Sequence, residues 1–163
     1  MQHANRRSVA RSDEGNTTIE FAASAMVILL SMIGIMEISR AMYVNHFVAN
    51  AAREGMRYAI VRGSGWQGTA CAAASSPSCT ASSSDVSKYV LSTVTPGIDP
   101  TQLVITASWP GIGADGTACD TSNGNNSAGC AVSVTVTYPY TILLPIPTRT
   151  FPMSSTTTGT VSF

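Results

Sequence analysis

The hydrophobic and polar positions of the chain predict a long helical region followed by a shorter region of strands. An apolar run extends from residue 19 to residue 38, and its only charged residues are Glu20 and Glu37, one at each end. Twenty residues of helix are about 30 Å long, enough to cross the hydrocarbon core of a bilayer. Because a carboxylate deep in lipid costs about 2.5–3.5 kcal/mol, the position of Glu20 requires an explanation.

The helical pattern continues beyond the apolar run. No proline occurs up to Arg62, and small or apolar residues recur at spacings of three and four, as expected for one face of a helix. These residues are Val44, Val48, Ala51, Ala52, Gly55 and Ala59. We therefore predict one continuous helix from near Asn16 to near Arg62, roughly 70 Å long, whose outer half packs against a folded domain. The glycines at 63 and 65 end it.

The region after residue 63 predicts a loop, a short helix and strands. Ser84 and Asp85 resemble a helix N-cap, followed by an apolar stripe. The stripe comprises Val86, Tyr89, Val90 and Val94. Residues 102–109 and 131–138 alternate in hydrophobicity and predict strands, with the odd positions from 103 to 109 facing one way.

Prolines at 139, 145 and 147 predict an irregular stretch, and residues 154–163 predict a last strand. Nothing in the pattern indicates parallel crossovers. The expected fold class is therefore α+β, with a long helix, a short helix and about three antiparallel strands.

Length and charge limit the possible functions. The 163 residues allow one modest domain plus a membrane segment, and the net charge is zero with 11% charged residues. No basic patch exists beyond the first 15 residues, so we expect no nucleic-acid partner. The low charge fits a surface covered by neighbouring subunits, or an ordinary extracytoplasmic domain.

The first 15 residues form a basic leader with arginines at 6, 7 and 11. By the positive-inside rule, they hold the N-terminus in the cytoplasm and send the chain after Ile38 outward. A secretory signal peptide is the alternative, but its apolar core is normally shorter and is followed by a small-x-small cleavage site. The sequence after Met36 offers no such site, so we expect the helix to be retained.

Four cysteines, at 71, 79, 119 and 130, all follow the apolar run. An even number on the exported side indicates disulfides. Of the three pairings, we favour the local ones, Cys71–Cys79 and Cys119–Cys130, because each closes a polar loop with little apolar content. A zinc site is the competing interpretation, but these spacings lack the usual CxxC pattern.

The chain offers little catalytic chemistry. Beyond residue 15 its only histidine is His46, its acids are scattered, and no GxSxG, Cys–His or P-loop pattern occurs. We therefore expect no enzymatic activity and no cofactor. Residues 115–126 are rich in oxygen ligands and could be considered for calcium, but they fail the EF-hand spacing, and Asp-Gly and Asn-Gly are ordinary turn formers. We expect no metal site.

The leader and the start of the apolar run resemble the class III signal of type IV pilins and pseudopilins. Gly15 stands where those leaders end, Asn16 is the new N-terminus, Glu20 is the fifth mature residue and Phe21 the sixth. The resemblance implies cleavage after Gly15 by a membrane prepilin peptidase and assembly through the helix that follows. It also implies that Glu20 pairs with an α-ammonium group, either its own or that of an adjacent subunit.

The sequence AAREGMR at residues 51–57 is similar to a segment of the TadE-like family, minor pseudopilins of the tight-adherence (Flp) pilus. Arg53, Gly55 and Arg57 match, while Met56 replaces the usual alanine. The resemblance covers roughly residues 15–62 and implies a pilin-like architecture. It also implies association with other pilins or pseudopilins, the pilus assembly platform and membrane lipid. Alternatively, Arg53 and Arg57 belong to a solvated face with one i,i+3 ion pair to Glu54.

These expectations describe three regions: a leader at 1–15, a helix at 16–62 that spans the inner membrane to about residue 38, and an extracytoplasmic α+β domain at 63–163. One rival interpretation is another pilin-like role, such as a major pilin or a type II secretion pseudopilin. The other is a signal-anchored extracytoplasmic binding or adhesin domain that never polymerises. That second rival needs neither cleavage at Gly15 nor a carboxylate at Glu20.

Overall fold

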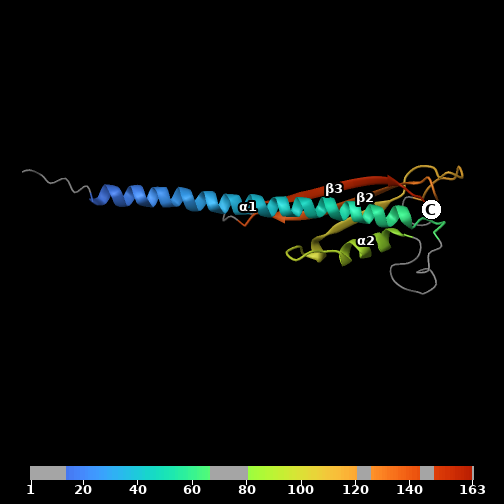
Figure 1. Ribbon diagram of the computed structural model, residues 1–163, viewed down its shortest axis with the longest axis horizontal. Coiled ribbons are helices and arrows are strands. Elements are labelled where there is room, and N and C mark those ends of the chain that lie inside the picture. The colour runs from blue at the N-terminus through green and yellow to red at the C-terminus, as the bar shows by residue number, and fades with distance from the viewer. Residues whose placement is uncertain (1–13, 67–80, 121–125, 144–148, 163) are drawn as a thin grey trace, which may run out of the picture. The chain divides into compact units, whose positions relative to one another are not determined.

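The computed structural model describes residues 14–66, 81–120, 126–143 and 149–162 (Figure 1). Internal contacts divide the chain into two compact units, one ending at Ser39 and the other beginning at Arg40. The expected bridge between Cys71 and Cys79 lies outside the described residues, as does the leader up to residue 13.

Helix α1 extends over Glu14–Val61, 48 residues, and confirms the predicted continuous helix to within two residues at each end. In the first unit its apolar side chains are uncovered, with Phe21 75% exposed and Leu30 58% exposed. An 18-residue window of this helix has a mean hydropathy of 2.1, and none of it is buried. Among the described residues, α1 is the one helix long and apolar enough to cross a membrane.

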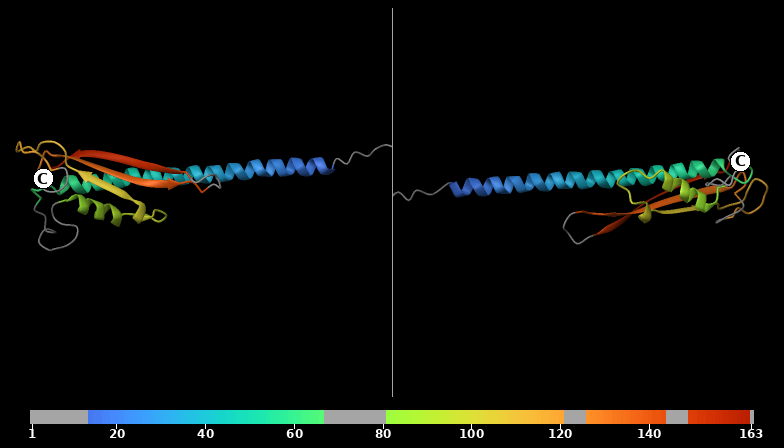
Figure 2. Two further views of the ribbon diagram at one scale, coloured as in Figure 1. Left: turned by 180° about the vertical axis from the view of Figure 1, so that it is seen from behind. Right: turned by 90° about the horizontal axis from the view of Figure 1, so that it is seen from below.

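The second unit contains the remainder of α1, a second helix and one antiparallel sheet (Figure 2). Its elements in chain order are α2 (Ser83–Ser92), the 3₁₀ turn η2 (Pro100–Gln102), β1 (Val104–Ser108), β2 (Ala131–Thr141) and β3 (Thr150–Thr160). The strands lie in the order β1-β2-β3, so each pairs with its neighbour in sequence. This arrangement confirms the predicted α+β class with a three-stranded antiparallel sheet.

Helix α2 begins earlier than predicted. Its N-cap is Ser82, not Ser84, and Asp85 is its third residue. The Ser82 hydroxyl accepts from the Asp85 amide at 3.2 Å, and the Asp85 carboxylate accepts from the Ser82 amide at 3.2 Å. This reciprocal capping box satisfies two amides at the helix start, which explains why the helix begins two residues before the predicted position.

The strands also differ from the prediction in their bounds, and β3 extends over Thr150–Thr160 instead of 154–163. Gln102 ends the turn η2, which Asp99 caps, and β1 begins only at Val104. Pro139 lies within β2, where an irregular stretch was predicted, and it is directly opposite Pro152 of β3. Opposed residues in an antiparallel ladder exchange either two hydrogen bonds or none, and two prolines are tolerated at a pair of the second kind. The hairpin therefore continues to the pair Thr141 and Thr150.

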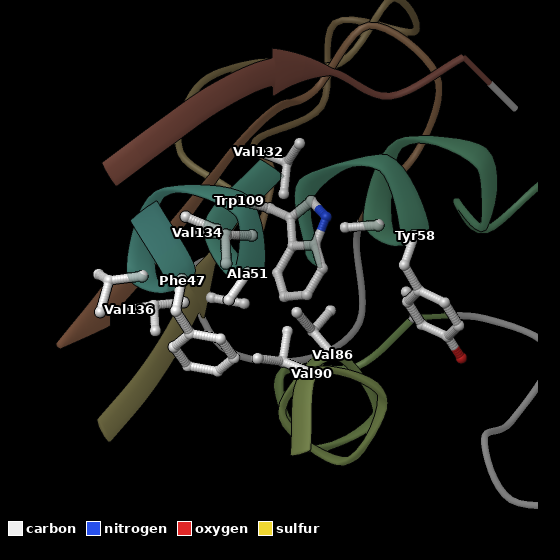
Figure 3. Packing of buried hydrophobic residues seen from close by; sticks show 14 of the residues in the cluster. Phe47, Ala51, Tyr58, Val86, Val90, Trp109, Val132, Val134 and Val136 are labelled. Atoms are coloured by element: carbon white, nitrogen blue, oxygen red, sulfur yellow. The ribbon is translucent and has the colours of Figure 1, made fainter. Parts of the chain in front are cut away.

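The predicted small-residue stripe of α1 is buried along its whole length, and Figure 3 shows Ala51 of this stripe beside Trp109 and the valines of β2. Val48, Ala52 and Ala59 have no exposed surface, and they share a core with Trp109, which is 1% exposed. The alternating valines of β2 complete it, each with no exposed surface: Val132, Val134 and Val136. The opposite face of β2 carries threonines that pair across the strands, as Thr135 and Thr156 do at 2.8 Å.

Gly55 is the point where α1 meets both other layers. A Cβ atom at this position would lie 2.9 Å from Val90 Cγ2 of α2 and 3.2 Å from Val134 Cγ1 of β2. Both valines are fully buried, so neither has free space into which to move. The absence of a side chain at Gly55 thus allows helix, helix and sheet to pack at close range.

We predict that Gly55→Val lowers the free energy of unfolding of the full chain in detergent by about 1–3 kcal/mol, because the added carbons overpack a filled core. Thermal unfolding followed by circular dichroism measures the effect. The matched control is Gly34→Val, because a Cβ at Gly34 would meet nothing within 4 Å. Equal unfolding temperatures for Gly55→Val and the unsubstituted protein would show that the close approach is not required.

Candidate membrane and assembly site

The first unit presents an apolar helical surface with one carboxylate at its start. Glu20 is exposed and lies four residues after Asn16, so the two positions are neighbours on one face of α1. The backbone of Gly15 and Asn16 is helical, and the side chain of Asn16 lies outside the described part. Phe21, the residue after Glu20, is the most exposed large apolar side chain of this unit.

Small residues follow Glu20 on the same segment of α1. Ala22, Ala23 and Ser24 are exposed, and Ala25 is half-buried. Small side chains allow helix backbones to approach closely where lipid surrounds them. The exposed surface from Ile19 to Ile38 therefore suits contact with acyl chains, with neighbouring helices, or with both.

The three matching residues of the AAREGMR segment differ in their surroundings in the second unit. Gly55 points into the core, whereas Arg53 and Arg57 are exposed on the outer face of α1. Arg57 Nη1 lies 3.5 Å from Glu54 Oε1, and these side chains are 71% and 45% exposed. This i,i+3 ion pair is the one that the sequence predicted, and at such exposure it contributes little to stability.

Aromatic rings and a guanidinium group stack on one another at the C-terminal end of α1. Arg62 lies 4.5 Å from the ring centre of Tyr58 and 4.9 Å from that of Trp66. Tyr58 also stacks on Tyr89 of α2, with ring centres 4.5 Å apart. Burial raises the pKa of the Tyr58 hydroxyl, an effect that Arg62 partly opposes, so the hydroxyl is neutral and accepts a hydrogen bond from Arg62 at 3.0 Å. Tyr58, Arg62 and Trp66 recur at a spacing of four residues in the sequence, but their contact with Tyr89 of α2 depends on the fold.

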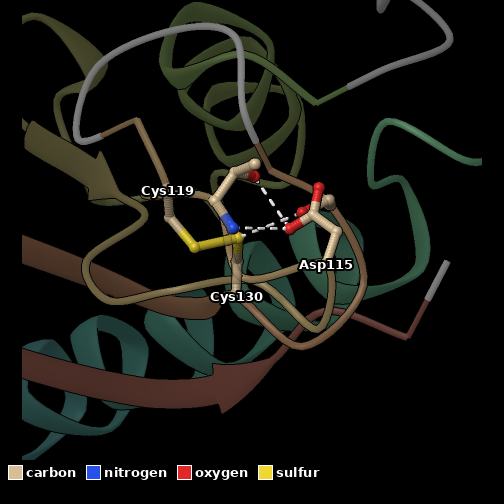
Figure 4. The surroundings of a disulfide bond; sticks show 5 residues. Asp115, Cys119 and Cys130 are labelled. Carbon is tan, nitrogen blue, oxygen red and sulfur yellow. Dashed lines mark hydrogen bonds between the residues drawn. A yellow bond between two sulfur atoms is a disulfide. The ribbon is translucent and has the colours of Figure 1, made fainter.

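Cys119 and Cys130 form a disulfide, one of the two expected local bridges (Figure 4). The bridge closes a loop whose backbone is tied to the end of β3, because the Val161 amide donates to the Cys130 carbonyl at 2.8 Å. Asn126 in the same loop donates to the Ala81 carbonyl at 2.8 Å, next to the start of α2. The loop thus connects elements that are distant in sequence.

Asp115 forms a turn just before this loop. Its carboxylate accepts from the amide and the hydroxyl of Thr117, at 3.0 and 2.7 Å, and these bonds lower the pKa of the carboxyl. This is the hydrogen bonding of an Asx turn, the ordinary structural role of an Asp-Gly pair. Within the described residues, no three His, Cys, Asp or Glu side chains come together as metal ligands.

His46 lies in a groove of about 230 Å³ on the surface of the second unit. Asn50 and Glu54 follow it at intervals of four residues on the same face of α1, and Thr93 and Thr95 form part of the opposite wall. Tyr43 marks one end, where its hydroxyl lies 2.7 Å from Thr95 Oγ1 and donates to the Pro96 carbonyl at 2.9 Å. The groove brings His46 and Glu54 to one surface, which the sequence did not indicate.

Comparison with protein families locates a relationship in α1. Residues 15–57 match the family model described as TadE-like protein. This segment is TadE-like. The match begins at Gly15, supports a protein related to the tight-adherence (Tad) pilus, and agrees with the resemblance inferred from the sequence.

The TadE-like segment covers roughly a quarter of the chain. It contains the exposed apolar surface, Glu20 and the buried face of α1 through Gly55, and it ends one residue before Tyr58. The searches of curated proteins and of solved structures gave no match.

We predict that the double substitution Cys119→Ala and Cys130→Ala lowers the free energy of unfolding by about 2–3 kcal/mol, because the open loop gains conformational freedom in the unfolded chain. Thermal unfolding in detergent without reductant measures the change. Ala118→Ser, at an exposed neighbouring position, is the control for a general effect of altering this loop. An unchanged unfolding temperature in the double variant would show that the bridge does not stabilise the domain.

Proposed function

We propose that this protein is a minor pseudopilin, a structural or assembly component of a tight-adherence (Flp) pilus or a related secretion system. The observation that carries the proposal is the TadE-like match beginning at Gly15, on a helix whose apolar half is uncovered. A core helix of a soluble protein would have that surface buried. An assembly subunit instead keeps it available for lipid before assembly and for neighbouring helices afterwards.

The continuity of α1 supports retention of the apolar segment. The helix passes without interruption from the exposed residues around Leu30 to the core residues Val44 and Val48. Removal of the apolar segment as a secretory signal would cut within this helix and leave a frayed end beside the core. We propose a single-pass protein of the inner membrane, with a cytoplasmic N-terminus and the second unit in the periplasm or outside the cell.

Processing by a prepilin peptidase after Gly15 is the next part of the proposal. Glycine at the scissile bond lets the backbone enter a protease site without a side chain in the way. Cleavage would create an α-ammonium at Asn16, one helical turn before Glu20. The partners we propose are this peptidase, other pilins or pseudopilins, the assembly platform and membrane lipid.

Glu20 has a physical role in this scheme. A carboxylate at the cytoplasmic end of an apolar helix is stabilised by the positive end of the helix dipole and by a nearby ammonium. Pairing with the ammonium of an adjacent subunit removes two charges from an apolar environment at once, so correct docking is favoured over incorrect docking. The small residues after Glu20 allow the helices to come close enough for that pairing.

We also propose that the protein is not an enzyme. Its histidine at 46 lies in an open groove and Asp115 is held in a turn. Asp85 is occupied by the capping box of α2. The carboxylates of Asp115 and Asp85 therefore have structural roles that account for their positions.

The proposal predicts that Glu20→Gln leaves membrane insertion and cleavage after Gly15 largely intact but reduces incorporation into the pilus or its assembly complex by tenfold or more, about the effect of one buried charge pair. Glu20→Asp, which keeps the charge, is the matched control and should retain more incorporation than Glu20→Gln. Fractionation of cells or purified assemblies and immunoblotting measure both steps.

Normal incorporation of Glu20→Gln would contradict the proposed pairing. An adhesin or binding domain anchored by α1 would show no dependence on Glu20 at all. Loss of insertion in Glu20→Gln would assign the residue to membrane targeting instead of assembly.

A further inference from the structure

We propose that the groove containing His46 binds the side chain of Arg53 from a second copy of this chain, and so joins neighbouring subunits through the second unit. The inference rests on the proposed function, because it requires subunits that stand side by side in one membrane. It adds a contact between folded domains to the pairing proposed for Glu20. All the residues that form this contact belong to the second unit.

The groove has the size of one long side chain. Its volume is about 230 Å³, below the roughly 300–1,000 Å³ of pockets that hold small-molecule ligands. Phe47 and Ala51 form its apolar part, and both are almost fully buried, so they offer a firm surface. An arginine can lay its aliphatic stem along such a surface while its charged end remains at a polar rim.

The threonine wall of the groove offers hydrogen-bond acceptors. The Thr93 hydroxyl donates to the Val90 carbonyl at 2.8 Å, so its lone pairs are what it can offer a ligand. The Tyr43 hydroxyl donates its one proton to the Pro96 carbonyl. Thr95 is therefore the donor in its 2.7 Å contact with Tyr43, and it too keeps only lone pairs for a ligand. A ligand that brings donors fits this wall.

The charge of the lining favours a cation. Glu54 supplies a carboxylate, and no lysine or arginine is among the described residues that line the groove. The pair of Glu54 with Arg57 spans 3.5 Å at an exposed site, a weak contact that leaves room for a second cation. A guanidinium has five N–H donors and no acceptor, so it matches a carboxylate beside hydroxyl oxygens.

Arg53 lacks an acidic partner within the described part of its own chain. It is exposed and forms no ion pair there. Arg57 follows it by four residues, and two like charges at this spacing destabilise an isolated helix. Arg53 does not line its own groove, because it lies about 100° around α1 from Glu54. A carboxylate from another chain would relieve the repulsion.

Subunits that stand side by side hold this arginine at the right level. Copies related by rotation about the membrane normal keep equal residues at equal heights. Consecutive Cα atoms are about 3.8 Å apart, so Arg53 of one copy and Glu54 of the next differ in height by less than about 4 Å at any inclination of the helix. Because Arg53 and the groove lie on different faces of α1, the contact is heterologous and can repeat from subunit to subunit.

The test is zero-length cross-linking of full chains in the membranes of cells that co-express two tagged copies. The first copy carries Arg53→Lys and Glu54→Gln, which together supply an amine and remove its own carboxylate. The second copy is unsubstituted. A carbodiimide joins an amine to a carboxylate that it touches, so a link between position 53 and Glu54 can form only between the two copies. The matched control replaces the second copy by Glu54→Gln. Lys88, the only lysine of the unsubstituted chain, measures the background.

We expect a denaturation-resistant dimer that carries both tags, with a link from position 53 to Glu54 identified by peptide mass spectrometry. Its yield should exceed that of the Glu54→Gln control by about fivefold or more. Equal yields, or links through Lys88 alone, would show that the groove does not receive this side chain, and would leave the proposed function intact. A linked dimer of chains that are not cut after Gly15 would support the contact and contradict only the proposed processing.

Discussion

Helix α1 has to bury two different surfaces in two different environments, and the rest of the structure depends on how it does so. From Ile19 to Ile38 its large apolar side chains are exposed in the single chain, while Glu37 is buried, and such an apolar surface suits cover by lipid or by other helices. From Val44 to Ala59 one stripe of small residues is covered by the sheet and α2. Gly55 sets the distance of that packing, because any side chain there would meet Val90 and Val134. One continuous helix thus carries both surfaces.

The sequence predicted the parts of this fold that depend on local periodicity. The stripe on α1 repeats with helical spacing and the valines of β2 with strand spacing, so the buried face of each element was predicted correctly. Two errors, the N-cap of α2 and the end of β2, concern features that hydrophobic periodicity does not determine. Three consecutive serines precede Asp85, and only the capping box selects Ser82 as the N-cap. Pro139 is acceptable in β2 because β1 ends at the pair Val104–Thr137, so one edge of β2 is free at Pro139.

The candidate functional residues also differ in whether the sequence alone could indicate them. Gly15, Glu20 and the apolar run could be singled out from the sequence because they lie in one contiguous stretch, and the TadE-like match begins at Gly15. Two contacts could not be predicted from the sequence, because each joins residues of different elements. They are the stack of Tyr58 on Tyr89 and the contact of Arg40 with Tyr140. Of the motif residues on α1, Gly55 has a packing role that structure explains, while Arg53 and Arg57 form an outward surface.

The central claim is that Gly15 ends a leader and that Asn16 becomes the N-terminus of an assembly subunit. Intact mass and N-terminal sequencing of the membrane-inserted protein, with and without its prepilin peptidase, test that claim most directly. We predict a chain that begins at Asn16 only when the peptidase is present. A chain that still begins at Met1 in the presence of an active peptidase would contradict the account and favour a binding domain anchored by α1.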